Sequence, residues 1–342
     1  MGTTRSSGST PPEDARGLLA FFVLAFALSW GLWLAIPSFD LDGGAAQGLR
    51  VAGRFGPSVA AVVVATAHGG RDGLLRLLVP LTRWRAASRL WLVALLGPPA
   101  VVLAAITLAA AFGQSPGQFN DPRTAYLVIP AIITILVIGG PLGEELGWRG
   151  FALDRLQTRL GPAVASLLLG LVWGLWHLPL FLNPDDVQYA LPLVTYLGQT
   201  TATAFVYTWL WNRTRSLPVV LALHTATNVA AGVFPLLVPE APSHAPITIA
   251  VGLATAIAIG LTWGTRGRLG QRAATDAAEA PGRRHPGWQS DFTSIAQGEE
   301  KTWTTRSWSS TPRGRAGACP SWSGRSWWDR PASRASSPRW CP

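Results

Sequence analysis

Six polar side chains interrupt apolar stretches of this chain, and their types suit the activation of water. In chain order they are Glu144, Glu145, Arg149, His177, His224 and Asn228. A carboxylate can take a proton from water, a histidine can assist that transfer, and N–H donors can stabilise the resulting oxyanion. A charged side chain near the centre of a bilayer costs roughly 2.5–3.5 kcal/mol on insertion scales, so such residues indicate a functional site. This set indicates hydrolysis inside a membrane.

The first group lies in the segment Gly143–Gly150, directly after an apolar stretch. On a helix, Glu145 and Arg149 are one turn apart and can form an ion pair. Glu144 points about 100° away from Glu145, toward a different neighbour. We expect Arg149 to keep one carboxylate ionised, and burial to poise Glu144 as a base. The alternative is a salt-bridge or capping cluster at the end of a helix.

The second and third groups lie within apolar segments. His177 closes the run Trp173–His177, midway along a predicted helix, and Pro179 should kink that helix and free a carbonyl near His177. His224 and Asn228 are four residues apart and share one helix face. The alternatives are a hydrogen-bonded packing histidine in the second group and polar side chains that join helices in the third.

Together the three groups supply a base, water-binding side chains and hydrogen-bond donors. These parts can hydrolyse an amide without a covalent nucleophile. The apolar segments contain no cysteine, because Cys319 and Cys341 both lie near the end of the chain. The H-E-x-x-H motif of zinc proteases does not occur.

Composition places these groups in a membrane protein. The chain of 342 residues is 49% hydrophobic and 13% charged, whereas soluble domains carry about 25% charged residues. We predict an all-α, polytopic membrane helical bundle of about eight transmembrane helices, most of them near the roughly 20 residues needed to cross a bilayer. They span residues 17–37, 54–68, 90–113, 124–142, 162–183, 190–211, 216–238 and 245–264. We expect segment 71–89 to lie on the membrane surface as a helix, with a plain basic loop as the alternative.

The distribution of arginine predicts the orientation. With a cytoplasmic N-terminus, twelve arginines fall in cytoplasmic segments, and Arg50, Arg54 and Arg123 fall on the opposite side. This bias predicts a multi-pass protein of the cell membrane with both termini cytoplasmic. The net charge of +10 follows from the same bias and from a basic tail. We therefore expect the lipid bilayer as a partner and no nucleic acid.

The chain divides into three parts. Residues 1–16 form a predicted cytoplasmic segment, residues 17–265 the membrane domain, and residues 270–342 a tail rich in Trp, Ser and Arg. The tail contains neither Leu nor Val, so it cannot form a core, and we predict that it is disordered. A frameshifted C-terminus and a membrane-binding tail are the two explanations of this composition.

The motifs resemble those of the CAAX-protease and bacteriocin-processing family of intramembrane endopeptidases, also called the CPBP or Abi family. That family is marked by E-E-x-x-x-R, F-x-x-x-H and H-x-x-x-N or D. Here these motifs read Glu144–Arg149, Trp173–His177 and His224–Asn228, with Trp173 in place of Phe. The run 55–58, Phe-Gly-Pro-Ser, also resembles the family's second-span signature. The resemblance covers roughly residues 15–265.

The resemblance implies about eight transmembrane helices around a polar cavity that opens to the cytoplasmic side. It implies that Glu144 activates water with help from His177, and that His224 and Asn228 stabilise the oxyanion. The residues expected to position the site and its substrate are Glu145, Arg149 and Trp173.

The metal requirement stays open at this point. The family has been described both as metalloproteases and as metal-independent glutamate proteases. A divalent metal such as zinc would take ligands of the His₂Glu type. The candidate ligands are His177, His224 and Glu144. Asn228 is a poor zinc ligand, which favours a metal-independent site.

We therefore expect an intramembrane endopeptidase that acts near the cytoplasmic side on a peptide or membrane-protein substrate. One alternative is a non-proteolytic immunity or scaffold protein that retains the fold, although such a relative should have lost at least one of the polar residues. A transporter would show repeated halves with broken helices, and no convincing repeat is present. The frequent Arg, Ala, Gly and Pro suggest a GC-rich coding sequence and a bacterial source.

Overall fold

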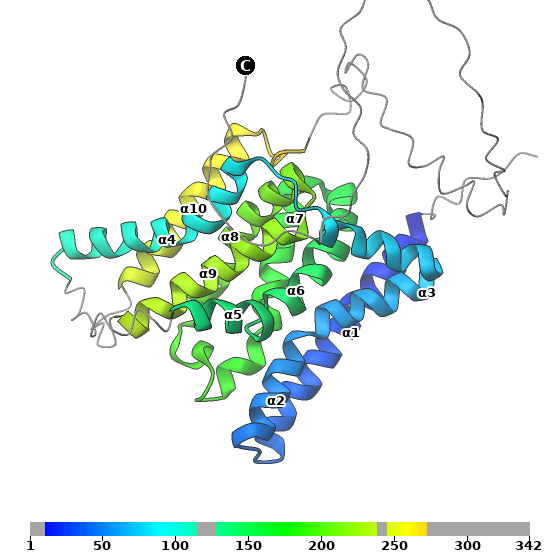
Figure 1. Cartoon of the computed structure of the whole chain (residues 1–342), viewed down its shortest axis with the longest axis horizontal. Helices are drawn as coiled ribbons and strands as arrows, with labels where there is room; N and C mark the ends of the chain where they lie inside the picture. Colours follow the sequence, from blue (N-terminus) through cyan, green and yellow to red (C-terminus); the bar gives the residue numbers. More distant parts are fainter. Residues whose placement is uncertain (1–10, 115–127, 238–244, 272–342) are drawn as a thin grey trace, which may run out of the picture. The chain divides into compact units, whose positions relative to one another are not determined.

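The computed structural model describes residues 11–114, 128–237 and 245–271, which form helices joined by short irregular segments (Figure 1). The long helices are α1 (Pro11–Ser38), α2 (Gly43–Arg54), α3 (Gly56–Leu78), α4 (Ser88–Ala111), α5 (Val128–Ile138), α6 (Pro141–Gly147), α7 (Asp154–Trp176), α8 (Leu193–Thr214), α9 (Leu217–Leu237) and α10 (Ala245–Gly264). The shorter helical segments are η1 (Val79–Thr82), η3 (Trp148–Leu153), η4 (Leu178–Leu182) and η5 (Val187–Ala190). The described residues contain no strand, which confirms the predicted all-α class.

Several helices are suited to cross a membrane. Within the described ranges, the four that are long and apolar enough are Ala15–Ser38, Ser88–Ala111, Pro141–Leu182 and Ala245–Gly264. Helices α2 and α3 meet at a bend of 45° and make a fifth when they count as one broken span. The expected multi-pass bundle is therefore confirmed, while the number of eight spans stays a prediction. The predicted tail lies outside the described residues from position 272 onward.

The largest difference from the predicted helices is α2. Residues 43–53 fall between the predicted helices 17–37 and 54–68, yet the structure has a separate helix there that ends at Arg54. The neighbouring helix α1 supports them, since Ser29 Oγ donates to the Gly53 carbonyl at 2.7 Å and Trp33 Nε1 donates to the Arg50 carbonyl at 3.1 Å. Tertiary packing thus stabilises a helix that the local sequence does not favour.

Two glycines end helices at positions that matter for the polar residues. Gly140 has φ of +117°, a conformation that side chains disfavour. The predicted span 124–142 is therefore interrupted: α5 stops at Ile138, and α6, which carries the glutamate pair, starts at Pro141. Gly161, with φ of +73° and ψ of 164°, breaks α7, in agreement with the predicted helix start at residue 162.

The segment predicted to lie on the membrane surface is only partly helical. It remains helical to Thr82, is irregular over residues 83–87, and re-enters a helix at Ser88. Arg71 and Arg76 are exposed, Leu75 is also exposed, and Leu77 is buried in the protein core. A position on the membrane surface stays a prediction for this segment.

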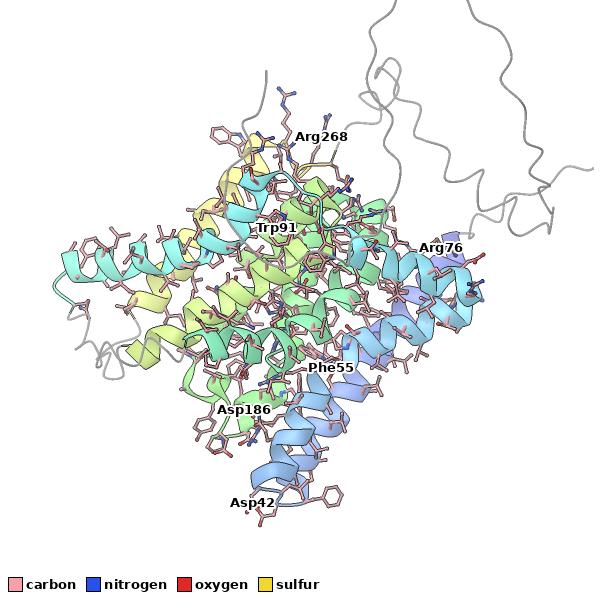
Figure 2. The ribbon with its side chains drawn as sticks, in the orientation of Figure 1. Asp42, Phe55, Arg76, Trp91, Asp186 and Arg268 are labelled. Atoms are coloured by element: carbon pink, nitrogen blue, oxygen red, sulfur yellow. The ribbon has the colours of Figure 1, made fainter. Side chains whose placement is uncertain are left out.

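Charged side chains of both signs lie toward each end of the helices. Figure 2 shows Arg76 and Arg268 in the upper part of the view, and Asp42 and Asp186 in the lower part. Arg50 nevertheless pairs with Asp186, and Arg215 pairs with Asp154. The orientation in the membrane therefore stays a prediction.

Close backbone packing fixes the polar helix α6 against its neighbours. A Cβ atom at Gly143 would lie 2.5 Å from the Arg54 carbonyl oxygen, and one at Gly147 would lie 2.5 Å from the Pro57 carbonyl oxygen. These glycines let α6 contact the junction of α2 and α3 directly. The position of the glutamate pair is therefore set by backbone contacts, which vary little.

Candidate active site

Glu145 lies at the centre of a buried ionic cluster. Its Oε1 atom accepts hydrogen bonds from Arg149 Nη1 at 2.8 Å and from His224 Nδ1 at 2.7 Å. Glu145, Arg149 and His224 are 0%, 1% and 2% exposed. The Arg149 guanidinium also lies over the rings of Trp173, at 4.8 Å, and Tyr207, at 4.3 Å. The cluster holds the His224 ring in one orientation, with Nε2 on the opposite side of the ring from Glu145.

Glu144 has a different environment although it is the next residue. Its Oε2 atom accepts a hydrogen bond of 2.6 Å from Trp173 Nε1. In the described part of the chain, its Oε1 atom has no protein partner. A Cβ atom at position 140 would overlap Oε1, so Gly140 leaves this oxygen the space that it occupies. Glu144 is therefore positioned by one hydrogen bond and keeps one carboxylate oxygen for another partner.

His177 lies at the end of α7 and not midway along a helix, which corrects the prediction. The helix ends at Trp176 and continues as the 3₁₀ segment η4, because Pro179 has no N–H and disfavours the α conformation of the residue before it. His177 Nδ1 lies 2.9 Å from the Trp173 carbonyl oxygen. Since a carbonyl only accepts, Nδ1 donates and Nε2 is the free ring nitrogen.

Aromatic side chains and one hydrogen bond hold His177 in place. Its ring centroid lies 4.6 Å from that of Trp176, 5.3 Å from that of Tyr196 and 6.4 Å from that of Trp33. Trp30 Nε1 donates to the Trp176 carbonyl at 2.8 Å, which ties the end of α7 to α1. The histidine thus sits on a rigid helix end.

Asn228 follows His224 by one turn of α9 and approaches the break between α5 and α6. Its Nδ2 atom lies 3.5 Å from the Gly139 carbonyl oxygen, at the limit of a hydrogen bond. Arg54 Nη1 donates to the adjacent Ile138 carbonyl at 2.8 Å. The backbone just before α6 is therefore contacted from both α9 and α2.

The three sequence motifs converge. Trp173 joins them, because it donates to Glu144, contacts Arg149, and lies with its ring 5.4 Å from that of His224. The sequence did not identify Tyr207 or Arg54: Tyr207 has no motif around it, and Arg54 was counted as a charge on the side opposite to the cytoplasm. Only the folded chain brings Tyr207 to the Arg149 guanidinium and Arg54 to the Ile138 carbonyl. The catalytic and positioning roles of the motif residues stay predictions.

The described residues do not provide a ready metal site. They contain no group of three His, Cys, Asp or Glu side chains that could hold a metal ion. Both candidate histidines use Nδ1 in protein contacts, and Glu144 uses Oε2. These contacts leave Nε2 of each histidine and Oε1 of Glu144 uncommitted, and a zinc-bound histidine commonly donates its other ring nitrogen to a carboxylate or a carbonyl. The metal requirement therefore stays a prediction, and we derive no step through a metal.

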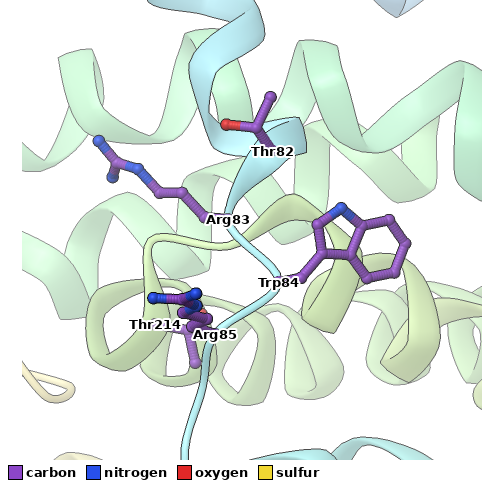
Figure 3. Close-up of a pocket in the computed structure, with 5 residues that line it drawn as sticks. All are labelled: Thr82, Arg83, Trp84, Arg85 and Thr214. Carbon is purple, nitrogen blue, oxygen red and sulfur yellow. The ribbon is translucent and has the colours of Figure 1, made fainter. Parts of the chain in front are cut away.

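A recess elsewhere on the protein is lined by Thr82, Arg83, Trp84, Arg85 and Thr214 (Figure 3). None of these residues belongs to the three motifs or contacts them through a described hydrogen bond. Its lining comes from the arginine-rich segment, which suits a membrane-surface region better than a hydrolytic site.

Comparison with known proteins finds similarity around the cluster. Residues 126–230 match the family model described as type II CAAX prenyl endopeptidase Rce1-like. CAAX prenyl protease 2 of Methanococcus maripaludis is 39% identical over 92 residues, which make up 27% of this chain and 34% of the relative. The chain thus matches about a third of the length of that curated relative. The matched segment contains all three motifs and is similar to the Rce1-like CAAX endopeptidases, in line with the resemblance of the motifs.

Proposed function

We propose that this protein is an intramembrane endopeptidase in which Glu144 activates the water that cleaves a peptide bond. The observation that carries the proposal is the asymmetry of the glutamate pair. Glu145 is bound by Arg149 and His224, whereas Glu144 accepts one hydrogen bond from Trp173. A carboxylate with an uncommitted oxygen can bind a water molecule and deprotonate it.

The proposed reaction proceeds in two steps. Glu144 takes a proton from water as the water oxygen bonds to the peptide carbonyl carbon, which yields a tetrahedral oxyanion. Glu144 then gives the proton to the peptide nitrogen, the C–N bond breaks, and the acid and amine products separate. His177 assists from Nε2, which can accept a hydrogen bond from the water because Nδ1 donates to Trp173.

His224 and Asn228 are the proposed oxyanion donors. Asn228 Nδ2 is a donor in its ordinary form. His224 Nε2 donates only when both ring nitrogens carry protons, and the Glu145 carboxylate 2.7 Å from Nδ1 is placed to balance the resulting charge. Removing one such donor typically lowers kcat by about 10²–10³. Glu145, Arg149 and Trp173 act through these groups and are positioning residues.

The proposed substrate is a peptide or membrane-protein segment that reaches the site from the bilayer. The curated relative is named a CAAX prenyl protease, so prenylated peptides are the first class to test. The excess of arginine in the segments predicted to be cytoplasmic supports cytoplasmic termini and cleavage near the cytoplasmic leaflet.

The test compares the full chain with Glu144→Gln in vesicles of defined lipid. Both proteins receive prenylated and unprenylated peptides, with and without a metal chelator, and new termini are identified by mass spectrometry. We expect cleavage by the natural sequence and a loss of about 10²–10⁴ in rate for the variant, the usual contribution of a general base. Equal product from both proteins would contradict the role of Glu144. No product from either, across peptides and natural membranes, would favour the scaffold or immunity alternative.

A further inference from the structure

Arg54 is a charged residue near the candidate site that the proposed reaction does not use. It is the last residue of α2, directly before the 45° bend into α3. Its side chain is partly buried and donates from Nη1 to the Ile138 carbonyl. A guanidinium carries five N–H donors, and the other groups of Arg54 are not used by any described hydrogen bond.

The backbone of Arg54 is held close to the glutamate pair. A Cβ atom at Gly143 would meet the Arg54 carbonyl oxygen at 2.5 Å and the Phe55 Cα atom at 3.0 Å. Gly143 immediately precedes Glu144 in the chain. The backbone that carries the Arg54 side chain is therefore fixed in position relative to the proposed base, Glu144.

The charge of Arg54 is not matched by an ion pair within the described residues. Arg149 pairs with Glu145 at 2.8 Å, and Arg50, one turn earlier on α2, pairs with Asp185 at 2.9 Å and Asp186 at 3.4 Å. Arg54 has no carboxylate at such a distance, although its backbone contacts that of Gly143, beside Glu144. A half-buried cation without a counter-charge favours a nearby anion, so an anion from outside the chain would be stabilised there.

We propose that Arg54 binds a carboxylate of the peptide substrate and makes the enzyme select peptides with a carboxylate near the cleaved bond. This inference rests on the proposed endopeptidase function. The guanidinium fork matches a carboxylate in two parallel hydrogen bonds. Arg54 and Asn228 contact neighbouring carbonyls, Ile138 and Gly139, which places the arginine beside the proposed oxyanion donor. Two sources share this chemistry: the C-terminal carboxylate of the peptide and an acidic side chain.

The experiment uses the full chain in neutral-lipid vesicles and three matched forms of a peptide that it cleaves. One form ends in a free carboxylate, one ends in an amide, and one ends in an amide but carries a Glu side chain near the cleavage site. We expect kcat/KM to be about tenfold to a hundredfold higher for a carboxylate form than for the plain amide, the range of a hydrogen bond to a charged group. Whichever carboxylate form shows the gain identifies the source.

Arg54→Gln should bring the ratio of kcat/KM for the carboxylate peptide to kcat/KM for the plain amide close to one. Cleavage of the amide peptide should persist, since glutamine can still donate to Ile138. Arg76→Gln, at an exposed arginine on α3, is the matched control and should keep the ratio of the natural sequence. A natural protein without any preference for a carboxylate overturns the inference, whether or not the variant folds. A preference that survives Arg54→Gln overturns it as well. A natural protein that cleaves none of the peptides overturns the proposed function itself, and this inference with it.

Discussion

The two glutamates of α6 are neighbours in sequence, yet the two sides of this helix are built differently. Glu145 accepts hydrogen bonds from Arg149 of η3 and His224 of α9, and Tyr207 of α8 lies under the Arg149 guanidinium. The Glu144 side chain lies toward Gly140 and α7, and Trp173 is its single hydrogen-bond partner in the described part of the chain. A rotation of about 100° per residue is enough to give identical side chains different surroundings.

The surroundings of Glu145 favour rigidity, and those of Glu144 favour reactivity. A buried ion pair needs good geometry and further hydrogen bonds to offset the desolvation of both charges. The Glu145 cluster meets this condition with two hydrogen bonds to one oxygen and two aromatic rings on the guanidinium. The Glu144 side gives up such contacts and keeps an oxygen for water. One side is thus expected to contribute stability, and the other reaction rate.

The largest effect on stability should come from Glu145→Gln. This change leaves the Arg149 charge buried without a counter-charge, and breaking a buried pair costs about 3–5 kcal/mol. We expect a lower unfolding temperature in detergent by differential scanning fluorimetry. Arg76→Gln, which removes an exposed charge, serves as the control. An unfolding temperature equal to that of the natural sequence would mean that the cluster is not a stabilising centre.

A smaller effect on rate should follow from Trp173→Phe. Phenylalanine, the residue usual in the family motif, fills much of the same space but cannot donate to Glu144. A hydrogen bond to a charged group contributes about 1.5–3 kcal/mol, so we expect kcat to fall by about tenfold to a hundredfold. Peptide cleavage in vesicles measures it.

Trp148→Phe is the matched control for the loss of packing, because Trp148 is also fully buried but its Nε1 atom has no partner in the described structure. If both tryptophan variants lowered kcat equally, packing and not the hydrogen bond to Glu144 would explain the effect.

The smallest effect concerns the connection between η4 and α8. Burial raises the pKa of Asp186, and the nearby Arg50 opposes the rise. A carboxyl with a raised pKa in the folded state stabilises the fold while it is protonated, and this contribution is lost as pH rises through the folded pKa. We expect a slight loss of stability of the natural protein above pH about 4. The unfolding temperature of Asp186→Asn should depend less on pH.

Thermal unfolding as a function of pH measures this dependence. Asp185→Asn is the control, because the Asp185 side chain is 76% exposed. A profile that stays as steep in Asp186→Asn as in the natural protein would show that another group titrates.

The sequence predicted the helices that have a clear apolar pattern and the motifs that lie on them. Helix α10 has the predicted bounds, and the i, i+4 spacing of Glu145 and Arg149 correctly predicted their ion pair. These features depend on local geometry, which a single sequence contains.

Features that depend on tertiary contacts could not be predicted in this way. Helix α2 forms against α1 in spite of its glycines. Arg50 and Arg54 were counted only as charges on the side opposite to the cytoplasm, although both make contacts between elements. The hydrogen bond from Trp173 to Glu144 joins residues 29 positions apart. Such contacts exist only once the helices pack.

The most direct test measures Glu144→Gln and Glu145→Gln side by side, with cleavage rate per folded molecule and unfolding temperature determined for each. We expect Glu144→Gln to unfold at the same temperature as the natural protein but to cleave at least about a hundredfold more slowly. We expect Glu145→Gln to unfold at a lower temperature and to lose less of its rate per folded molecule. Equal losses of rate and stability in both variants, or a fully active Glu144→Gln, would contradict the division of roles between the two glutamates.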